Sequence, residues 1–141
     1  MAQQEHKLQA QIFTWHWNNK PTERGRLFAT FQEVKSPIEG GLKKSLGLVR
    51  GVPDLVLVRD GGFLVGIELK TPNSTHLVSH LIEQCSWLIN VPYIGYFCDT
   101  FKMAEEVLNG GKGIDPKKVL DYCKSVTTKN ILWDNTLFIT K

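Results

Sequence analysis

Two short apolar segments joined by a glycine pair constrain the fold of this chain more than any other feature. Residues 54–59 (DLVLVR) and 63–70 (FLVGIELK) have the length and the β-branched content of strands, and residues 60–62 (DGG) lie between them. Glycine readily adopts the positive φ angles that tight turns need. We therefore predict an antiparallel hairpin over residues 54–70.

The open end of this hairpin carries ionisable side chains. Asp54 starts the first strand, while Glu68 and Lys70 end the second. Because successive strand residues point to opposite faces, Glu68 and Lys70 share one face, about 6.5–7 Å apart along the strand. The other face takes Phe63, Val65, Ile67 and Leu69. Two carboxylates grouped with an ammonium favour a site for a hard cation and a phosphate group.

The rest of the chain alternates between helical and extended patterns. Helices are predicted over residues 5–19, 76–90, 101–108 and 115–126, and further strands over 26–33 and 92–98. The succession of strand, helix and strand from residue 63 to 98 implies a right-handed crossover. Residues 127–141 fit either an edge strand or an extended tail that docks on the core. The predicted fold class is α/β, with a central mixed β-sheet flanked by helices in a single domain spanning residues 1–141.

Positive charge is concentrated ahead of the hairpin. Residues 1–53 hold eight lysines and arginines against four acids, a net charge of +4, whereas residues 54–141 hold nine against ten, a net charge of −1. Segment 35–50 combines three glycines with basic residues that include Lys43, Lys44 and Arg50. Cations beside carboxylates suit a protein that holds a phosphate backbone near acids that would repel it, so we predict a DNA-contacting flap. The alternative is an ordinary solvated loop.

Four further polar residues are candidates for the same site. Glu33 ends the inward-facing row of its predicted strand, where it lies either in solvent or in the site. Gln84 falls on the apolar stripe formed by residues 77, 81, 84 and 88 of its helix. Burying its amide without partners costs ~1–3 kcal/mol, so the site edge would supply them, unless the amide reaches solvent. His76 and His80 have no third ligand in register, which favours a surface or phosphate-contacting role over zinc binding.

Several classes of protein are disfavoured by the remaining features. The three cysteines, Cys85, Cys98 and Cys123, form no CxxC pair and are interpreted as core thiols in a reducing compartment. No apolar run approaches the ~20 residues that span a bilayer, and the polar N-terminus is not a signal peptide. We expect a cytoplasmic protein without a membrane partner, located in the host cytoplasm if the chain is encoded by a phage.

Together these motifs resemble the VRR-NUC family of the PD-(D/E)xK nuclease superfamily, whose members occur alone in small phage and bacterial proteins and as domains of larger repair enzymes. The resemblance covers about residues 5–100 and rests on the following matches: Gly51-Val52-Pro53-Asp54, Glu68-Leu69-Lys70, Gln84, the strand with Gly95-Tyr96, and Glu33 as the upstream acid. Two positions depart from the family pattern. Gln32 stands where asparagine is frequent, and Thr71-Pro72-Asn73-Ser74 replaces a loop that often bears glycine.

The resemblance implies a restriction-endonuclease-like core in the order αβββαβ and a site for Mg²⁺ or Mn²⁺. Its ligands would be Asp54, Glu68, the backbone carbonyl of Leu69 and Glu33. Lys70 would orient the attacking water or neutralise developing charge, and Gln84 would position Lys70 or that water.

The implied activity is that of a structure-selective DNA endonuclease acting on Holliday junctions or other branched DNA as a homodimer. Flap-directed, end-directed or restriction-like nucleases share the fold and remain alternatives. A non-catalytic DNA-binding module is an alternative of another class. An α/β domain whose acids are only surface charges is disfavoured, because two acids side by side on adjacent strands are costly without a cation.

Overall fold

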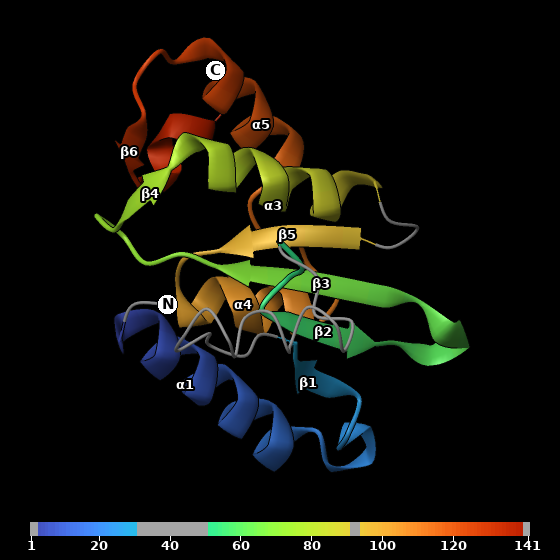
Figure 1. Cartoon of the computed structure of the whole chain (residues 1–141). Helices are drawn as coiled ribbons and strands as arrows, with labels where there is room; N and C mark the ends of the chain where they lie inside the picture. The colour runs from blue at the N-terminus through green and yellow to red at the C-terminus, as the bar shows by residue number, and fades with distance from the viewer. Residues whose placement is uncertain (1–2, 31–50, 91–93, 140–141) are drawn as a thin grey trace, which may run out of the picture.

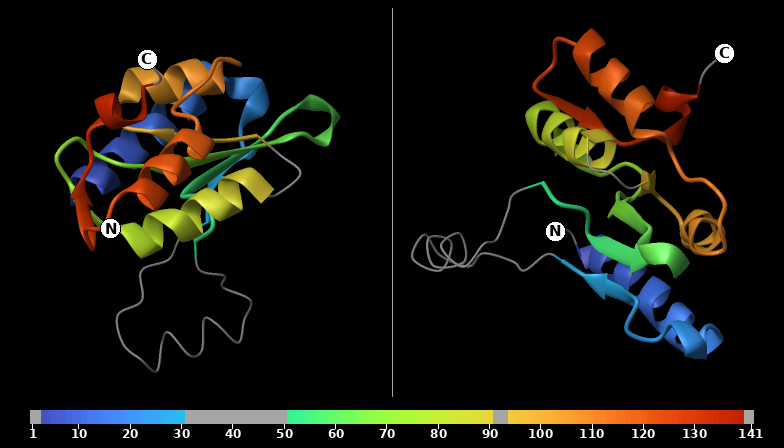
Figure 2. Two further views of the ribbon diagram at one scale, coloured as in Figure 1. Left: turned by 90° about the horizontal axis from the view of Figure 1, so that it is seen from above. Right: turned by 90° about the vertical axis from the view of Figure 1, so that its right-hand side faces the viewer.

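The computed structural model describes residues 3–30, 51–90 and 94–139, which form three layers (Figure 1). The middle layer is a four-stranded sheet in the order β1 (Leu27–Ala29), β2 (Leu55–Val58), β3 (Leu64–Leu69) and β5 (Ile94–Cys98). The outer layers are α1 (Gln3–Asn19) and α4 (Phe101–Leu108) on one face, and α3 (Val78–Asn90) and α5 (Pro116–Ser125) on the other (Figure 2). Strand β3 is antiparallel to β2 and parallel to β5. The predicted α/β class with a mixed, helix-flanked sheet is confirmed.

The predicted hairpin is the centre of this sheet. Leu55 of β2 is paired with Ile67 of β3, and a short 3₁₀ turn, Asp60–Gly62, joins the strands. Gly61 has a φ of +82°, a conformation that side-chain-bearing residues rarely adopt. The face prediction for β3 is correct for Val65, Ile67 and Leu69, which are buried. It is wrong for Phe63, which precedes the strand and is exposed.

Two hydrophobic cores lie on opposite faces of the sheet. The first, under α1 and α4, contains Leu8, Ile12, Leu27, Leu55, Leu57, Val65, Ile67, Leu69, Cys98, Ala104, Val107 and Leu108. The second, under α3 and α5, contains Leu81, Cys85, Leu88, Phe97, Val119, Cys123, Ile131, Trp133 and Phe138. All three cysteines are free and buried, as predicted. Burial of this apolar surface is the main stabilising term of such a fold.

Helix α3 lies unusually close to β5. A Cβ atom added to Gly95 would stand 2.6 Å from Cδ2 and 3.0 Å from Cα of Leu88. Only glycine therefore allows α3 to pack against the sheet at this point. This close contact sets the distance between α3 and the sheet. It therefore also sets the position of the polar residues in the first turns of α3.

The predicted helix over residues 76–90 begins later than expected. Residues Thr75–Leu77 form a strand, β4, which pairs antiparallel with β6 (Asn130–Leu132) in a second, two-stranded sheet. Leu77 is thus not on the helical stripe, whose buried members are Leu81, Cys85 and Leu88. The backbone hydrogen bonds offered by a distant segment outweigh the local helical pattern.

The C-terminal segment is part of this second sheet and of the second core. Trp133 is fully buried, and its indole nitrogen donates to Oδ2 of Asp99 at 3.3 Å. Residues 127–141 were expected to form either an edge strand or a docked tail. In the described part of this segment, residues 130–132 form a strand that pairs with β4 and not with the central sheet. A 3₁₀ turn, Asn135–Phe138, follows.

The remaining element boundaries agree with the sequence within a few residues. Helix α1 begins two residues earlier than predicted, and α4 matches its predicted range. Helix α5 starts at Pro116, with Asp115 as the N-cap that accepts from the backbone of Lys117 at 2.9 Å. Only residues 27–29 of the predicted strand 26–33 are described as β1, and the predicted flap 35–50 lies outside the described residues. No helix in the described part of the chain is both long and apolar enough to cross a membrane.

Candidate functional site

Asp54 is fixed at the start of β2 by the hairpin itself. Its Oδ2 accepts a hydrogen bond from the backbone N–H of Leu69 at 2.8 Å, and the residue is 5% exposed. The backbone carbonyl of Asp54 accepts from the N–H of Thr30 at 3.1 Å. A carboxylate that accepts a backbone N–H of the neighbouring strand cannot turn away into solvent without losing that bond. The predicted proximity of Asp54 to the end of β3 is confirmed.

Glu68 and Lys70 share one face at the end of β3, as predicted. The Nζ of Lys70 lies 3.7 Å from Oε2 of Glu68, and the two residues are 5% and 3% exposed. The backbone N–H of Lys70 donates to the carbonyl of Cys98 at 3.0 Å, which extends the parallel pairing of β3 with β5. Both ionisable groups are therefore anchored at the end of β3 and removed from bulk water.

The environment of Glu68 disfavours its charge. Burial raises the pKa of Glu68 well above its usual range, and the charge of Asp54 raises it further. Lys70 acts in the opposite direction, while a hydrogen bond with Asp54 and the charge of Glu5 add to the rise in pKa. Without a further cation, Glu68 holds its proton more readily than a carboxyl group in water does.

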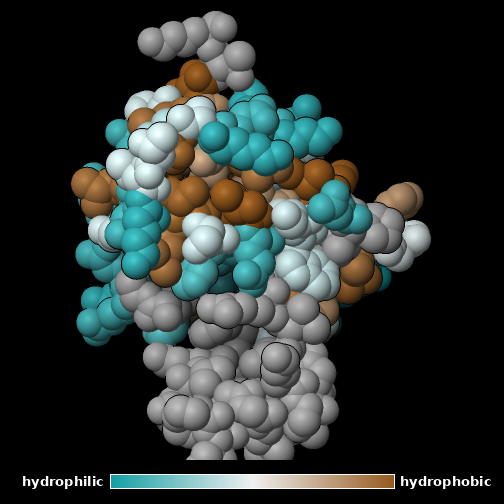
Figure 3. All heavy atoms as spheres, turned by 45° about the horizontal axis from the view of Figure 1, so that its top comes forward, coloured by the Kyte–Doolittle hydropathy of each residue, from teal (hydrophilic) through white to brown (hydrophobic). Residues whose placement is uncertain are grey.

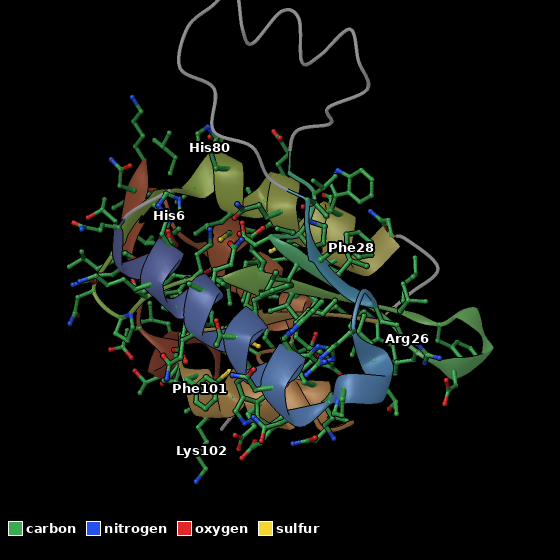
Figure 4. The ribbon with its side chains drawn as sticks, turned by 90° about the horizontal axis from the view of Figure 1, so that it is seen from below. His6, Arg26, Phe28, His80, Phe101 and Lys102 are labelled. Atoms are coloured by element: carbon green, nitrogen blue, oxygen red, sulfur yellow. The ribbon has the colours of Figure 1, made fainter. Side chains whose placement is uncertain are left out.

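These residues line a cavity of about 400 Å³ at the end of β3. Its walls come from the first turns of α1 and α3, the start of β2, the end of β3, and β4. His6 of α1 and His80 of α3 mark these two helix starts in Figure 4. Both helices thus direct the positive ends of their dipoles towards this part of the molecule, which favours anionic occupants.

Gln84 is brought to the cavity, as predicted. It lies on α3 and its Oε1 is buried without a hydrogen-bond partner. An unpartnered buried amide oxygen costs about 1–3 kcal/mol. A ligand in the cavity that donates a proton, or a cation, would offset this cost.

Glu5 belongs to the same cavity, although the sequence analysis did not select it. It lies in the first turn of α1, is buried, and raises the pKa of Glu68. The available signal was its position: Glu5, Leu8, Ile12 and His16 form the buried stripe of the helix. An acid on the buried side of an amphipathic helix is uncommon unless it has a partner.

His76 and His80 both line the cavity, in keeping with their selection. Burial and the charge of Lys70 lower the pKa of His76 to about 4, so its imidazole is neutral at physiological pH. Its Nε2 lies 2.6 Å from the hydroxyl of Ser74. His80 is more exposed and stands at the rim. Whether either residue contacts a phosphate stays a prediction.

Four predicted residues lie outside the described residues. They are Glu33, Lys43, Lys44 and Arg50, so their place relative to the cavity stays a prediction. Within residues 3–30, 51–90 and 94–139, no group of three or more His, Cys, Asp or Glu side chains is arranged to hold a metal ion. The backbone of Leu69 is positioned beside Asp54 through its N–H, and a role for its carbonyl as a ligand also stays a prediction.

A larger cavity, of about 840 Å³, opens between the start of β5 and the first turn of α5. Its walls are mainly apolar, and its ionisable residues include the exposed Lys112, Lys117 and Lys118. The surrounding surface carries exposed apolar side chains, including Ile94 and Ile139, and apolar areas also alternate with hydrophilic ones on the face shown in Figure 3. The smaller cavity holds the buried acids, so it is the better candidate for a reaction site.

Comparisons with protein-family models, curated proteins and solved structures give no match. The smaller cavity, with its buried acids and Lys70, is therefore the feature of the molecule that points to a function.

Proposed function

We propose that this protein is a Mg²⁺- or Mn²⁺-dependent DNA endonuclease with a restriction-endonuclease-like core, of the VRR-NUC type. The observation that carries the proposal is the buried group of Asp54, Glu68 and Lys70 in a polar cavity at a strand end. Two carboxyls and an ammonium so close together are unfavourable as a purely structural device, because each loses hydration. They are suited to hydrolysis of a phosphodiester.

The residues fit a divalent cation of the magnesium type. Such an ion is usually held by one or two carboxylates together with water and substrate phosphate, so a third acidic ligand is not required. Asp54 and Glu68 would hold it, with the carbonyl of Leu69 as a further oxygen. The unpartnered Oε1 of Gln84 is a hydrogen-bond acceptor for water in the same cavity. When bound, the cation supplies charge neutralisation at the phosphate and a more acidic water.

The side chains of the chain have separate tasks in this proposal. Lys70 directs its ammonium towards the cavity from a buried position, where its charge is screened less than in water. It would stabilise negative charge that develops on the phosphate, or orient the attacking water. Gln84 would orient that water through its amide. Glu5 would accept hydrogen bonds from water on the opposite wall.

The expected substrate is branched DNA, cut by a homodimer. Two cuts related by symmetry require two sites related by a twofold axis. Flap-directed, end-directed and restriction-like cleavage use the same chemistry, so substrate preference has to be measured. A non-catalytic DNA-binding module would have no need for both acids beside Lys70.

The test is a cleavage panel with purified protein. Four-way junctions, flaps, splayed arms and plain duplexes are incubated with Mg²⁺, Mn²⁺ or EDTA, with Asp54→Asn as the matched inactive control. We expect metal-dependent cleavage, strongest on branched DNA, that Asp54→Asn loses. Sedimentation on junction DNA tests the dimer. DNA binding without cleavage under all metal conditions would favour the non-catalytic module and refute the proposed activity.

A further inference from the structure

A second hollow adjoins the cavity that holds the buried acids. It has a volume of about 480 Å³ and shares two wall residues, Glu5 and His76, with that cavity. The two hollows are therefore neighbours, with Glu5 and His76 between them. The volume of the second hollow is within the range of small-ligand sites.

Apart from the buried acid Glu5, the walls of this second hollow are neutral and polar. One side is the first turn of α1, with Gln3 and Gln4. The other side is the loop after β3, with Thr71 and Ser74, followed by the start of β4, with His76. The first N–H groups of a helix have no partner within the helix, and they carry the positive end of the dipole. Helix starts of this kind bind phosphate groups.

Thr71 gives an independent indication that this hollow receives a ligand. The residue is 7% exposed, lies in the wall of the hollow, and its hydroxyl has no hydrogen-bond partner. Its neighbour Ser74 is not in this situation, because the hydroxyl of Ser74 donates to the carbonyl of Thr71 at 2.6 Å. The single proton of Ser74 is thus used, and Nε2 of His76 must be the donor in their 2.6 Å contact. Thr71 is left as the hydroxyl whose proton is available.

The C-terminal segment holds this loop in place. The N–H of Asn73 donates to the carbonyl of Trp133 at 2.8 Å, and the N–H of Trp133 donates to the carbonyl of Ser74 at 2.8 Å. Residues 75–77 are paired with β6 directly afterwards. These hydrogen bonds hold the loop that carries Thr71 in a fixed conformation. A binding site needs side chains that are held in place in this way.

We infer that the second hollow binds the phosphodiester group adjacent to the one that is cleaved, through the hydroxyl of Thr71 and the first turn of α1. The inference rests on the proposed nuclease function, which places the cleaved group in the first cavity. It assigns the substrate class as a strand with at least two consecutive phosphodiesters. A simple phosphate diester that fills the first cavity alone would gain nothing from Thr71.

The experiment combines a substitution with position-specific removal of phosphate charge. Glu68→Gln serves as the parent, because in the proposed mechanism it should bind DNA without cleaving it. Binding is measured by fluorescence anisotropy for this parent and with Thr71→Val, Thr71→Ser or Thr127→Val added; Thr127 is exposed and lies outside the hollow. The oligonucleotides carry one neutral methylphosphonate on the 5′ side of the cleaved bond, on the 3′ side, or several linkages away. The cut position is mapped with the wild-type protein.

The expected result is selective. Thr71→Val weakens binding of the all-phosphate strand about 10-fold, the effect of one hydrogen bond to a charged group. Thr71→Ser and Thr127→Val bind as the parent does. A methylphosphonate at one of the two flanking positions weakens DNA binding by the parent to a similar degree. With that oligonucleotide, adding Thr71→Val causes no further loss of affinity. The melting temperature of Thr71→Val is not below that of its parent, since a buried unpartnered hydroxyl is replaced by a methyl group.

The outcomes separate the two proposals. If the parent binds DNA, the wild type cuts it, and Thr71→Val binds every oligonucleotide as the parent does, the second phosphate site is refuted while the nuclease function stands. An equal loss of DNA-binding affinity for all three methylphosphonate positions also refutes the second phosphate site. If the wild type cuts no DNA and the parent binds none, the nuclease function is refuted, and the site inferred from it is refuted as well.

Discussion

Replacement of Glu68 by glutamine should make the metal-free protein more stable at neutral pH, although it removes a group of the proposed active site. Burial and the neighbouring charge of Asp54 raise the pKa of Glu68 well above its usual range. An acid whose pKa is higher in the folded state stabilises the fold fully below its unfolded pKa. This contribution is lost as the pH rises towards the folded pKa. Glutamine has no such titration and nearly the same shape.

The size of the effect follows from proton linkage. Between the unfolded pKa of Glu68, near 4.5, and its raised folded value, the folded state binds one more proton than the unfolded state. The free energy of unfolding then falls by about 1.4 kcal/mol for each pH unit. Between pH 5 and pH 7 the wild type should lose up to about 2.8 kcal/mol relative to Glu68→Gln. For a chain of this size that corresponds to about 8 °C in melting temperature.

His76 also titrates in this range, with the opposite sign. Its pKa is lowered to about 4, mainly by burial, so the unfolded state binds the extra proton below pH 6.5 and stability falls as the pH decreases. The effects of Glu68 and His76 therefore oppose each other in the wild type between about pH 4.5 and 6.5. The difference between wild type and Glu68→Gln isolates the Glu68 contribution, because His76 is present in both proteins.

The assay is thermal and urea unfolding in EDTA, from pH 5 to pH 8 at constant ionic strength. Glu106→Gln, an exposed position on α4, is the matched control and should follow the wild type at each pH. The stability difference between Glu68→Gln and wild type should increase with pH. A difference that is independent of pH, or that decreases as the pH rises, would refute the reasoning, since it would mean that Glu68 is at least as readily ionised in the folded chain as in the unfolded one.

Three further predictions concern the site and its support. Lys70→Ala should fold, as judged by circular dichroism, and retain Mn²⁺ binding by calorimetry, yet lose DNA cleavage; cleavage near the wild-type rate would contradict the role given to Lys70. Glu5→Gln should cut DNA with about 10-fold weaker apparent Mg²⁺ affinity, as expected for a residue that orients ligands, and an unchanged Mg²⁺ titration would exclude Glu5 from the site. Gly95→Ala should lower the free energy of unfolding by about 1–3 kcal/mol, because its methyl group would overlap Leu88, and a neutral effect in urea unfolding would show that α3 can move away without cost.

The hairpin and its ionisable residues could be predicted because their determinants are local. A glycine turn and the alternation of side chains along β3 fix which residues of neighbouring strands meet. Asp54, Glu68 and Lys70 were therefore located from sequence, and the structure brings them together. The position of Gln84 at the edge of the site could be predicted from the helical spacing of residues within a single helix.

The features that escaped prediction depend on contacts between distant parts of the chain. The pairing of β4 with β6 joins residues more than fifty positions apart, and nothing in the Thr75–Leu77 sequence favours a strand over the first turn of a helix. Glu5 enters the site because α1 crosses the sheet in one direction and not the other, which its own sequence does not specify. The acid sought upstream was Glu33, outside the described residues, whereas the structure presents Glu5.

Strand β3 uses alternate residues for two purposes, and this couples correct folding to a correct site. Ile67 and Leu69 enter the hydrophobic core, and Glu68 and Lys70 between and beside them line the cavity. A shift of the pairing by one residue would exchange the two sets, so that charges entered the core and aliphatic groups the cavity. A chain with misaligned β3 would thus be both unstable and inactive. Insertion or deletion of a single residue between β2 and the end of β3 should be tolerated far less well than most point substitutions there.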